Sequence, residues 1–229
     1  MENNGKQIVI SLGGSIIVPE EIDVKFLTDF TGAIRNYVAN GFKFLIITGG
    51  GKICRKYNES LKQVTSPTFE NLDWLGIAVT RLNAEFIRIC FGNLSYEKIV
   101  LNPDDIPHTD KSIIVGGGWK PGNSSDLAAI HSAKSIGAKK VLNLSNIDFV
   151  YDKDPKNNKD ARPIKQMSWF EFRALFPDSW KPGGNVPFDP IAAEEAERSG
   201  IEVVILNGRN IENLKNCLDG KDFEGTVIK

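Results

Sequence analysis

Three short apolar segments, each running directly into a group of glycines, constrain the fold of this sequence more than any other feature. Short continuous apolar runs separated by helical stretches are typical of a parallel sheet whose two faces are both covered. Further runs at 141–144 and 202–206 predict two more strands of that sheet. The three segments with their glycines are 7–12 before Gly13-Gly14-Ser15, 42–48 before Gly49-Gly50-Gly51, and 112–115 before Gly116-Gly117-Gly118.

The stretches between these segments carry helix signals. Apolar residues spaced three or four apart predict an amphipathic helix over 71–91, whose apolar stripe faces either the core or a subunit interface. A hairpin is expected around 145–167, and the alternation of strands and helices predicts an α/β fold. The stripe consists of Leu72, Leu75, Val79, Leu82, Phe86 and Ile89.

Two later helices have recognisable ends. Ser125 or Asp126 is predicted to cap a helix that runs to Gly137, because short polar side chains accept from the first free N–H groups. Asp189-Pro190 is predicted to open another helix, with proline in its first turn and Gly200 as its stop.

Length and charge limit the classes of function. At 229 residues the chain fits one large domain better than two independent ones. Lysine and arginine number 28 against 29 acidic residues, for a net charge of −1. A dedicated nucleic-acid binder carries a strong basic excess, so nucleic acid is not an expected partner.

Cysteine and histidine usage narrows the chemistry further. The three cysteines Cys54, Cys90 and Cys217 form no close pair, which favours a reducing cytoplasm over a disulfide framework. Only two histidines occur, so no metal ligand set and no histidine-based triad are expected. No apolar run is long enough for a membrane segment or a signal peptide, and we expect neither.

Glycine loops at the carboxyl ends of parallel strands are a place where large anions bind, because glycine lets the backbone approach closely. Three such loops predict a large polyanionic ligand. Gly51-Lys52 is followed by isoleucine, so the phosphate-binding loop of Walker ATPases is absent. The spacing of a dinucleotide-binding fingerprint is absent as well.

Seven stretches in this order resemble the amino acid kinase superfamily and, within it, the archaeal-type uridylate (UMP) kinases. The resemblance extends from Ile8 to Ile228. It implies a three-layer α/β/α sandwich with a mainly parallel central sheet, formed by a single domain over 1–229. The acceptor part would lie mainly in 1–135 and the ATP part mainly in 136–229. The stretches are SLGGSIIVPE (11–20), ITGGGKICRKY (47–57), FENLDWLGIAVTRLNA (69–84), GGWKPGNSSDLAAI (117–130), NLSNIDFVYDKDP (143–155), FDPIAAEEAERSGI (188–201) and EGTVI (224–228).

The resemblance implies a role for individual residues. Gly14, Ser15 and Gly51 would line the channel of the transferring phosphate, with Arg55 reaching phosphate. Gly50 would lie on the UMP side. Asp73 would hold the ribose of UMP, and the loop Trp119, Lys120, Pro121, Gly122, Asn123, Ser124 and Ser125 would wrap the uracil and its phosphate. The adenosine of ATP would lie against Ser145, Asn146, Tyr151 and Asp154.

Each assignment has a purely structural alternative. The alternative for Arg55 and Asp73 is a solvated helix residue, which is the less favoured reading of both, and the alternative for Ser124 and Ser125 is a helix cap. Trp119 and Tyr151 fit a core, and Asp154-Pro155 is a typical turn start. Cys54 and Cys90 are expected to be small core residues rather than reactive thiols.

Phosphoryl transfer to a nucleotide needs positioning and charge neutralisation more than acid–base groups, so the scarcity of histidine is no obstacle. The resemblance implies ATP with Mg²⁺ bound through its phosphates, a homohexamer built from dimers, and a role in pyrimidine biosynthesis. Lys52, Arg55, Lys120 and Lys181 lie near the glycine loops and are candidates for the positive charge, Lys52 being the weakest. We expect Lys181, Lys120 and Arg55 to be the catalytic residues.

Two positions depart from the superfamily. Ser11 stands where many members have a lysine, and Phe149 stands where a glycine is usual beside the adenosine. A kinase of the same fold with another acceptor, such as isopentenyl phosphate, is one alternative to a UMP kinase. A nucleotide-binding regulatory or storage module without transfer activity is the other.

Overall fold

The computed structural model describes residues 6–176 and 186–229, and a mainly parallel sheet of seven strands lies at its centre. Five neighbouring pairs are parallel, and only β9 and β8 run antiparallel to each other among the described strands of this sheet. In spatial order the strands are β3 (Ile113–Gly116), β2 (Lys43–Thr48), β1 (Gln7–Leu12), β4 (Lys140–Ser145), β8 (Glu202–Asn207), β9 (Thr226–Ile228) and β7 (Gln166–Met167). The predicted α/β fold is therefore confirmed, as are the five strands expected from apolar runs.

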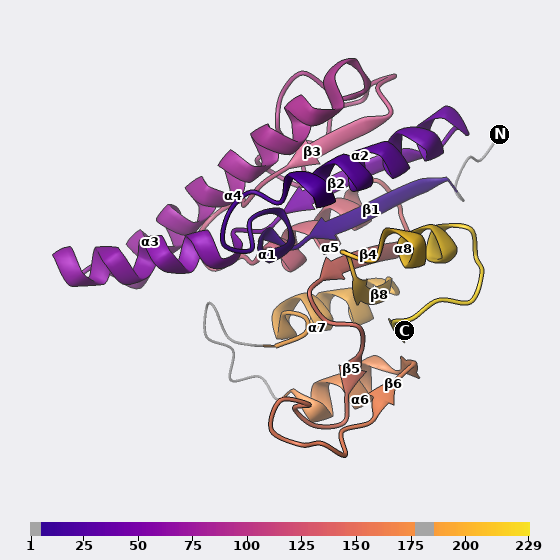
Figure 1. Ribbon diagram of the computed structural model, residues 1–229. Coiled ribbons are helices and arrows are strands. Elements are labelled where there is room, and N and C mark those ends of the chain that lie inside the picture. Colours follow the sequence, from indigo (N-terminus) through magenta and orange to yellow (C-terminus); the bar gives the residue numbers. More distant parts are fainter. Residues whose placement is uncertain (1–5, 177–185) are drawn as a thin grey trace.

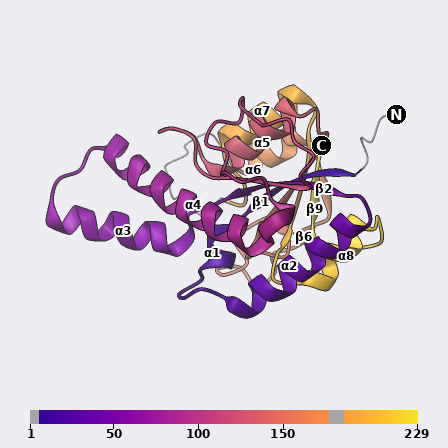
Figure 2. The same cartoon turned by 90° about the horizontal axis from the view of Figure 1, so that it is seen from above.

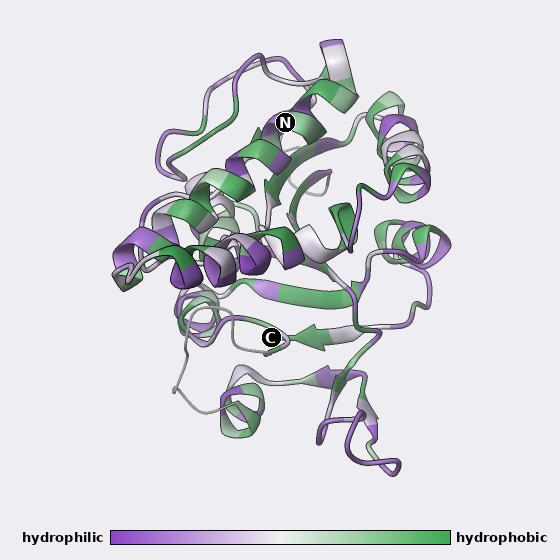
Figure 3. Ribbon diagram, turned by 60° about the vertical axis from the view of Figure 1, so that its left-hand side comes forward, coloured by the Kyte–Doolittle hydropathy of each residue, from purple (hydrophilic) through white to green (hydrophobic). Residues whose placement is uncertain are grey.

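Helices cover both faces of this sheet (Figures 1 and 2). One apolar layer joins the sheet to α5 (Ser125–Ser135), α6 (Trp169–Leu175) and α7 (Pro190–Ser199). The other joins it to α1 (Gly14–Ile17), α2 (Val24–Ala39), α4 (Phe69–Phe91) and α8 (Ile211–Leu218). The central strands are strongly hydrophobic (Figure 3), as double coverage requires.

The register of the sheet sets where ligands can bind. Leu12 at the end of β1 pairs with Thr48 on β2 and with Leu144 on β4. The glycine loops that follow β1 and β2 therefore leave the sheet at the same edge. A separate two-stranded hairpin, β5 (Val150–Tyr151) with β6 (Pro163–Ile164), lies beside that edge, as predicted.

Helix ends agree with the sequence in part. Asp189 caps α7 by accepting from the backbone of Ile191 and Ala192, and Gly200 ends that helix with a φ of 59°. The cap of α5 is Ser124, one residue before the predicted Ser125 or Asp126. The prediction failed there because two serines precede the aspartate, and Asp126 turns into the protein instead.

Helix α4 and its neighbour α3 (Gly51–Val64) project from the body as an antiparallel pair (Figure 2). The predicted apolar stripe on α4 is not a single core face. Leu82 is 70% exposed and Ile89 61%, whereas the face of α4 that carries Ile77, Ala84 and Ile87 is buried. The helix carries apolar residues on both sides, and only one of these two faces packs against the core.

Two glycines form a matched pair for a stability test. Gly32 lies inside α2 and Gly200 at the left-handed end of α7, and a Cβ atom would meet no atom within 4 Å at either. We expect Gly32→Ala to raise the free energy of unfolding by about 0.5–1 kcal/mol. Gly200→Ala should lower it by about 1–2 kcal/mol, because its positive φ strains any L-residue. Urea unfolding of both variants measures this, and equal shifts would contradict the assigned backbone conformation.

Candidate active site

The loops after β1 and β2 approach so closely that only glycine fits between them. A Cβ atom on Gly14 would lie 2.4 Å from the carbonyl oxygen of Gly49 and 2.4 Å from the nitrogen of Gly51. Gly51 has a φ of +64°, and a Cβ there would lie 2.5 Å from the nitrogen of Ser15. The structure thus brings together Gly14, Ser15, Gly50 and Gly51, whose backbone atoms line this edge of the sheet.

Two helices begin at the same place. Helix α3 starts at Gly50 without any side-chain cap, so its first N–H groups remain available to an anion. Helix α5 starts at Ser124, whose hydroxyl oxygen accepts from the backbone of Leu127. Ser125 Oγ would lie 3.4 Å from a Cβ on Gly49, which puts this serine at the glycine loops. Helix N-termini carry partial positive charge and suit phosphate groups.

The loop from Trp119 to Ser125 closes over this edge and is held by Asp73. The backbone N–H of Gly122 donates to Asp73 Oδ2 at 2.8 Å. Lys120 Nζ lies 3.9 Å from the centre of the Trp119 ring, and Asn123 Nδ2 donates to the carbonyl of Pro121. Asp73 therefore contacts the loop to which the sequence assigned the acceptor, and it is partly exposed.

Sequence reasoning missed three neighbouring residues of α4 that contact the loops: Thr80, Arg81 and Asn83. Asn83 Nδ2 donates to the carbonyl of Gly49 at 2.8 Å, and Thr80 Oγ1 accepts from the N–H of Gly118 at 2.7 Å. Arg81 donates to the carbonyl groups of Gly118 and Trp119. Thr80 and Asn83 are buried polar residues on an otherwise apolar face, which is the signal that could have singled them out.

The residues assigned to ATP line one cavity of about 360 Å³. Phe149 lines it too, with its ring 6.3 Å from that of Tyr151 in an edge-to-face arrangement. Tyr151 is partly exposed and does not belong to the core. Asp154 binds its own turn, since its carboxylate accepts from Lys156 N and Asn157 Nδ2. The predicted members lining the cavity are Ser145, Asn146, Tyr151 and Asp154.

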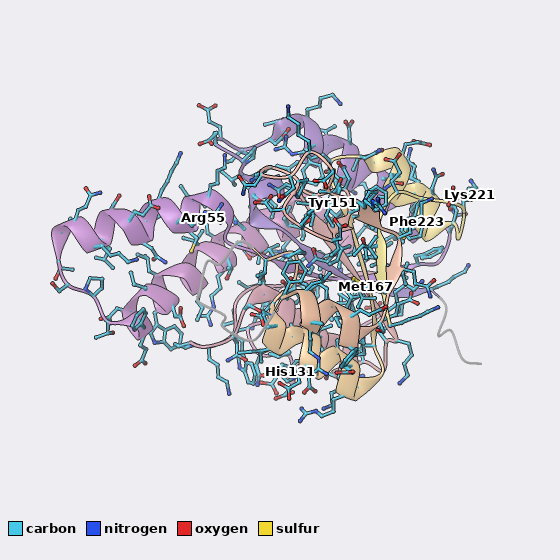
Figure 4. The ribbon with its side chains drawn as sticks, turned by 90° about the horizontal axis from the view of Figure 1, so that it is seen from below. Arg55, His131, Tyr151, Met167, Lys221 and Phe223 are labelled. Carbon is cyan, nitrogen blue, oxygen red and sulfur yellow. The ribbon has the colours of Figure 1, made fainter. Side chains whose placement is uncertain are left out.

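The candidate cations are placed differently from one another. Arg55 is exposed on the projecting α3 (Figure 4). Lys52 and Lys56 both pair with Glu20, so the charge of Lys52 already has a carboxylate partner. Lys120 stacks on Trp119, as described above, and Lys181 lies outside the described residues.

The Ser11 position reveals a further group that the sequence did not predict. Ser11 Oγ donates to Asp126 Oδ1 at 2.9 Å, and Asn143 Nδ2 donates to the same oxygen at 2.8 Å. Asp126 Oδ2 accepts from the N–H of Asp189. Withdrawal from water, with the nearby Asp189 carboxylate, raises the pKa of Asp126 to about 6, although these hydrogen bonds oppose the shift.

Other features lie away from this edge. A second cavity, of about 550 Å³, is at the amino ends of the strands and is lined by residues such as Lys6, Lys43 and His108. Burial raises the pKa of the Cys54 and Cys90 thiols, and both residues are partly rather than fully buried.

Over 6–176 and 186–229 no three acidic, histidine or cysteine side chains gather to hold a metal ion. None of the helices in those ranges has the length and apolar character of a membrane span.

Comparison with known proteins identifies the family. The sequence profile of the amino acid kinase family matches residues 6–207. The chain belongs to the amino acid kinase family. One relative is the uridylate kinase of Methanobrevibacter smithii. It is 32% identical to this chain, and the match covers 97% of this chain and 99% of the relative. The uridylate kinase of Pyrobaculum neutrophilum is 33% identical over 96% of this chain and 98% of its own.

Solved structures of the family agree with the fold. The crystal structure of uridylate kinase from Archaeoglobus fulgidus matches with a TM-score of 0.82 at 29% identity, covering 97% of this chain and 99% of the other. UMP kinase from Bacillus anthracis matches with a TM-score of 0.78 at 20% identity, covering 98% and 96%. The second likeness concerns the fold alone. Together they confirm the three-layer sandwich expected from the sequence.

The raised pKa of Asp126 predicts a pH-dependent stability. A carboxyl group that titrates near 6 when folded binds its proton more tightly than in the unfolded chain, so it stabilises the fold below its ordinary pKa. That contribution is lost as pH rises through about 6. We expect the difference in unfolding free energy between wild type and Asp126→Asn to shift against the wild type from pH 4 to pH 7 and then level off. Urea unfolding across this range measures it, and a constant difference would refute the shift.

Proposed function

We propose that this chain is a UMP kinase that transfers the γ-phosphate of ATP to UMP, giving UDP and ADP. The observation that carries the proposal is the junction of the loops after β1 and β2, whose backbone atoms meet without side chains between them. The Asp73-held loop lies on one side of this junction and the cavity of Tyr151 on the other. Near-full-length similarity to uridylate kinases supports UMP as the acceptor.

In this mechanism the acceptor phosphate needs no base. Its second pKa is about 6, so it is an anionic nucleophile at neutral pH. One of its oxygens attacks the γ-phosphorus while the bond to the bridging oxygen of ADP breaks, and ADP leaves with that electron pair. The N–H groups at the starts of α1 and α3 would stabilise the charge that spreads over the transferring group.

Positive charge would come from three sources. We propose that Arg55, Lys120 and Lys181 approach the phosphates, since Ser11 supplies no charge at the end of β1. Mg²⁺ would be carried by the nucleotide phosphates and would neutralise part of their charge. We also propose that the single domain binds the acceptor mainly through residues 1–135 and ATP mainly through residues 136–229. We propose a cytoplasmic location for the protein.

The proposal is tested by ADP release with a panel of acceptors: UMP, CMP, dUMP, AMP and isopentenyl phosphate. We expect turnover that requires UMP and Mg²⁺. Turnover with isopentenyl phosphate but not with UMP would favour the kinase with a different acceptor. Nucleotide binding without ADP release from any acceptor would favour a regulatory or storage module.

Asp73 is predicted to recognise the ribose of UMP. A carboxylate that accepts from the ribose hydroxyl groups contributes about 1.5–3 kcal/mol. Asp73→Ala should therefore raise the KM for UMP about ten- to a hundredfold and erase any preference for UMP over dUMP, while the KM for ATP stays nearly unchanged. Steady-state kinetics with the three nucleotides measure this, with Asp73→Asn as the control that keeps an oxygen for Gly122 N. An unaltered UMP/dUMP ratio would remove Asp73 from the site.

One of Lys120 and Lys181 is predicted to compensate for Ser11. Replacing the compensating lysine by methionine should lower kcat by about 10²-fold with UMP binding nearly intact, because the contact strengthens in the transition state. Single-turnover kinetics of Lys120→Met and Lys181→Met decide between them. Wild-type rates in both variants would exclude this role.

We also propose that the exposed stripe on α4, formed by Leu82, Phe86 and Ile89, joins copies of this chain in a homo-oligomer, a hexamer by family resemblance. A contiguous exposed apolar face is typical of a protein interface. Leu82→Lys should reduce the molar mass in light scattering, whereas Val64→Lys, at a still more exposed position at the far end of α3, should not. A monomeric wild type, or an unchanged mass for Leu82→Lys, would contradict the interface.

A further inference from the structure

Arg81 occupies an unusual position for a charged side chain on α4. Its guanidinium group donates from Nε to the carbonyl of Gly118 at 3.1 Å and from Nη2 to the carbonyl of Trp119 at 2.9 Å. The side chain is partly buried. We call the loop from Trp119 to Ser125 the acceptor loop. Two carbonyl groups at its start, those of Gly118 and Trp119, therefore point at one cation.

The backbone N–H of Gly118 is held as well as its carbonyl group. The N–H of Gly118 donates to Thr80 Oγ1 at 2.7 Å, and the carbonyl of Thr80 accepts from Thr48 Oγ1 at 2.9 Å. Neighbouring residues of α4 thus fix both polar groups of Gly118. The direction in which the loop leaves β3 is set by this helix, because a Cβ on Gly117 would lie 3.0 Å from the Cα of Arg81.

The charge of Arg81 is not neutralised locally. Within the ranges 6–176 and 186–229 it forms no ion pair with a carboxylate, whereas Arg88, two turns further along α4, pairs with Glu85. A partly buried cation without a carboxylate partner keeps its field for the nearby site, where water screens it less than at the surface.

We propose that Arg81 is a positioning residue for the acceptor phosphate. It turns the carbonyl groups of Gly118 and Trp119 toward α4 and away from the acceptor loop's inner side, where carbonyl oxygens would repel an anion. Its unpaired charge adds a favourable potential for the same anion. This inference rests on the proposed function, because it assigns the loop to a nucleotide acceptor.

The geometry requires arginine rather than any cation. A planar guanidinium reaches two carbonyl groups at fixed angles, whereas the ammonium group of lysine is a single point on a flexible stem. Arg81→Lys keeps the charge but should lose one of the two hydrogen bonds. Comparing the two variants therefore separates orientation of the loop from electrostatic attraction.

The test compares Arg81→Gln, Arg81→Lys and the matched control Arg88→Gln. Calorimetry with UMP alone gives the Kd, kinetics give kcat and the KM for ATP, and thermal unfolding gives Tm. We expect Arg81→Gln to weaken UMP binding about tenfold or more, and Arg81→Lys to recover only part of that loss. The KM for ATP and kcat should change little in both variants. Arg88→Gln should bind UMP like the wild type.

The outcomes are separable from those of the acceptor assay. If wild type does not turn over UMP, the proposed function fails first. If wild type is active and Arg81→Gln binds UMP normally, this inference alone is wrong. A loss shared equally by UMP affinity, ATP affinity and Tm would make Arg81 merely structural and would also overturn it. If Arg81→Gln does not fold, Arg81→Lys decides, and wild-type UMP affinity in that variant would refute the role of the guanidinium fork.

Discussion

The close approach of Gly14 to the backbone at 49–51 is the contact on which the rest of the site depends. With a Cβ position only 2.4 Å from neighbouring main-chain atoms, no side chain fits there without separating β1 from β2 at their carboxyl ends. The floor of the site is consequently made of peptide groups, whose positions follow from the sheet. Side chains on α4 and α5 then only need to adjust what the sheet has already placed.

The fold was largely predictable because the strands are short, apolar and punctuated by glycine. The runs at 7–12 and 202–206 became β1 and β8 with ends within one residue. The strands β7 and β9 were missed, since three residues or fewer carry no periodicity, and pairing at the sheet edge decides their conformation. The sequence left open whether the α4 stripe meets the core or a subunit interface, because periodicity reports which residues share a helix face and not what that face contacts.

The site was less predictable than the fold. Family resemblance drew attention to Asp73 and to the residues around Tyr151. The structure places Asp73 against Gly122 and places Tyr151 with its neighbours around one cavity. The resemblance gave no reason to consider Asp126, Thr80 or Arg81, because their importance comes from partners distant in sequence. Considered alone, Ser11 only marked the absence of a lysine charge. In the structure its hydroxyl group donates a hydrogen bond to Asp126, which is 115 positions away in the sequence.

The two sides of the site differ in how they are built. The side proposed for the acceptor depends on one long helix, α4, which is bonded to the neighbouring loops through Asp73, Thr80, Arg81 and Asn83. The cavity proposed for the donor is lined by the short β5–β6 hairpin and by loop residues outside the central sheet. Surface loops accept sequence change far more readily than a helix engaged along its length. Under the proposed function, substitutions such as the one at Phe149 can alter recognition of the phosphate donor while the contacts of α4 on the proposed acceptor side stay unchanged.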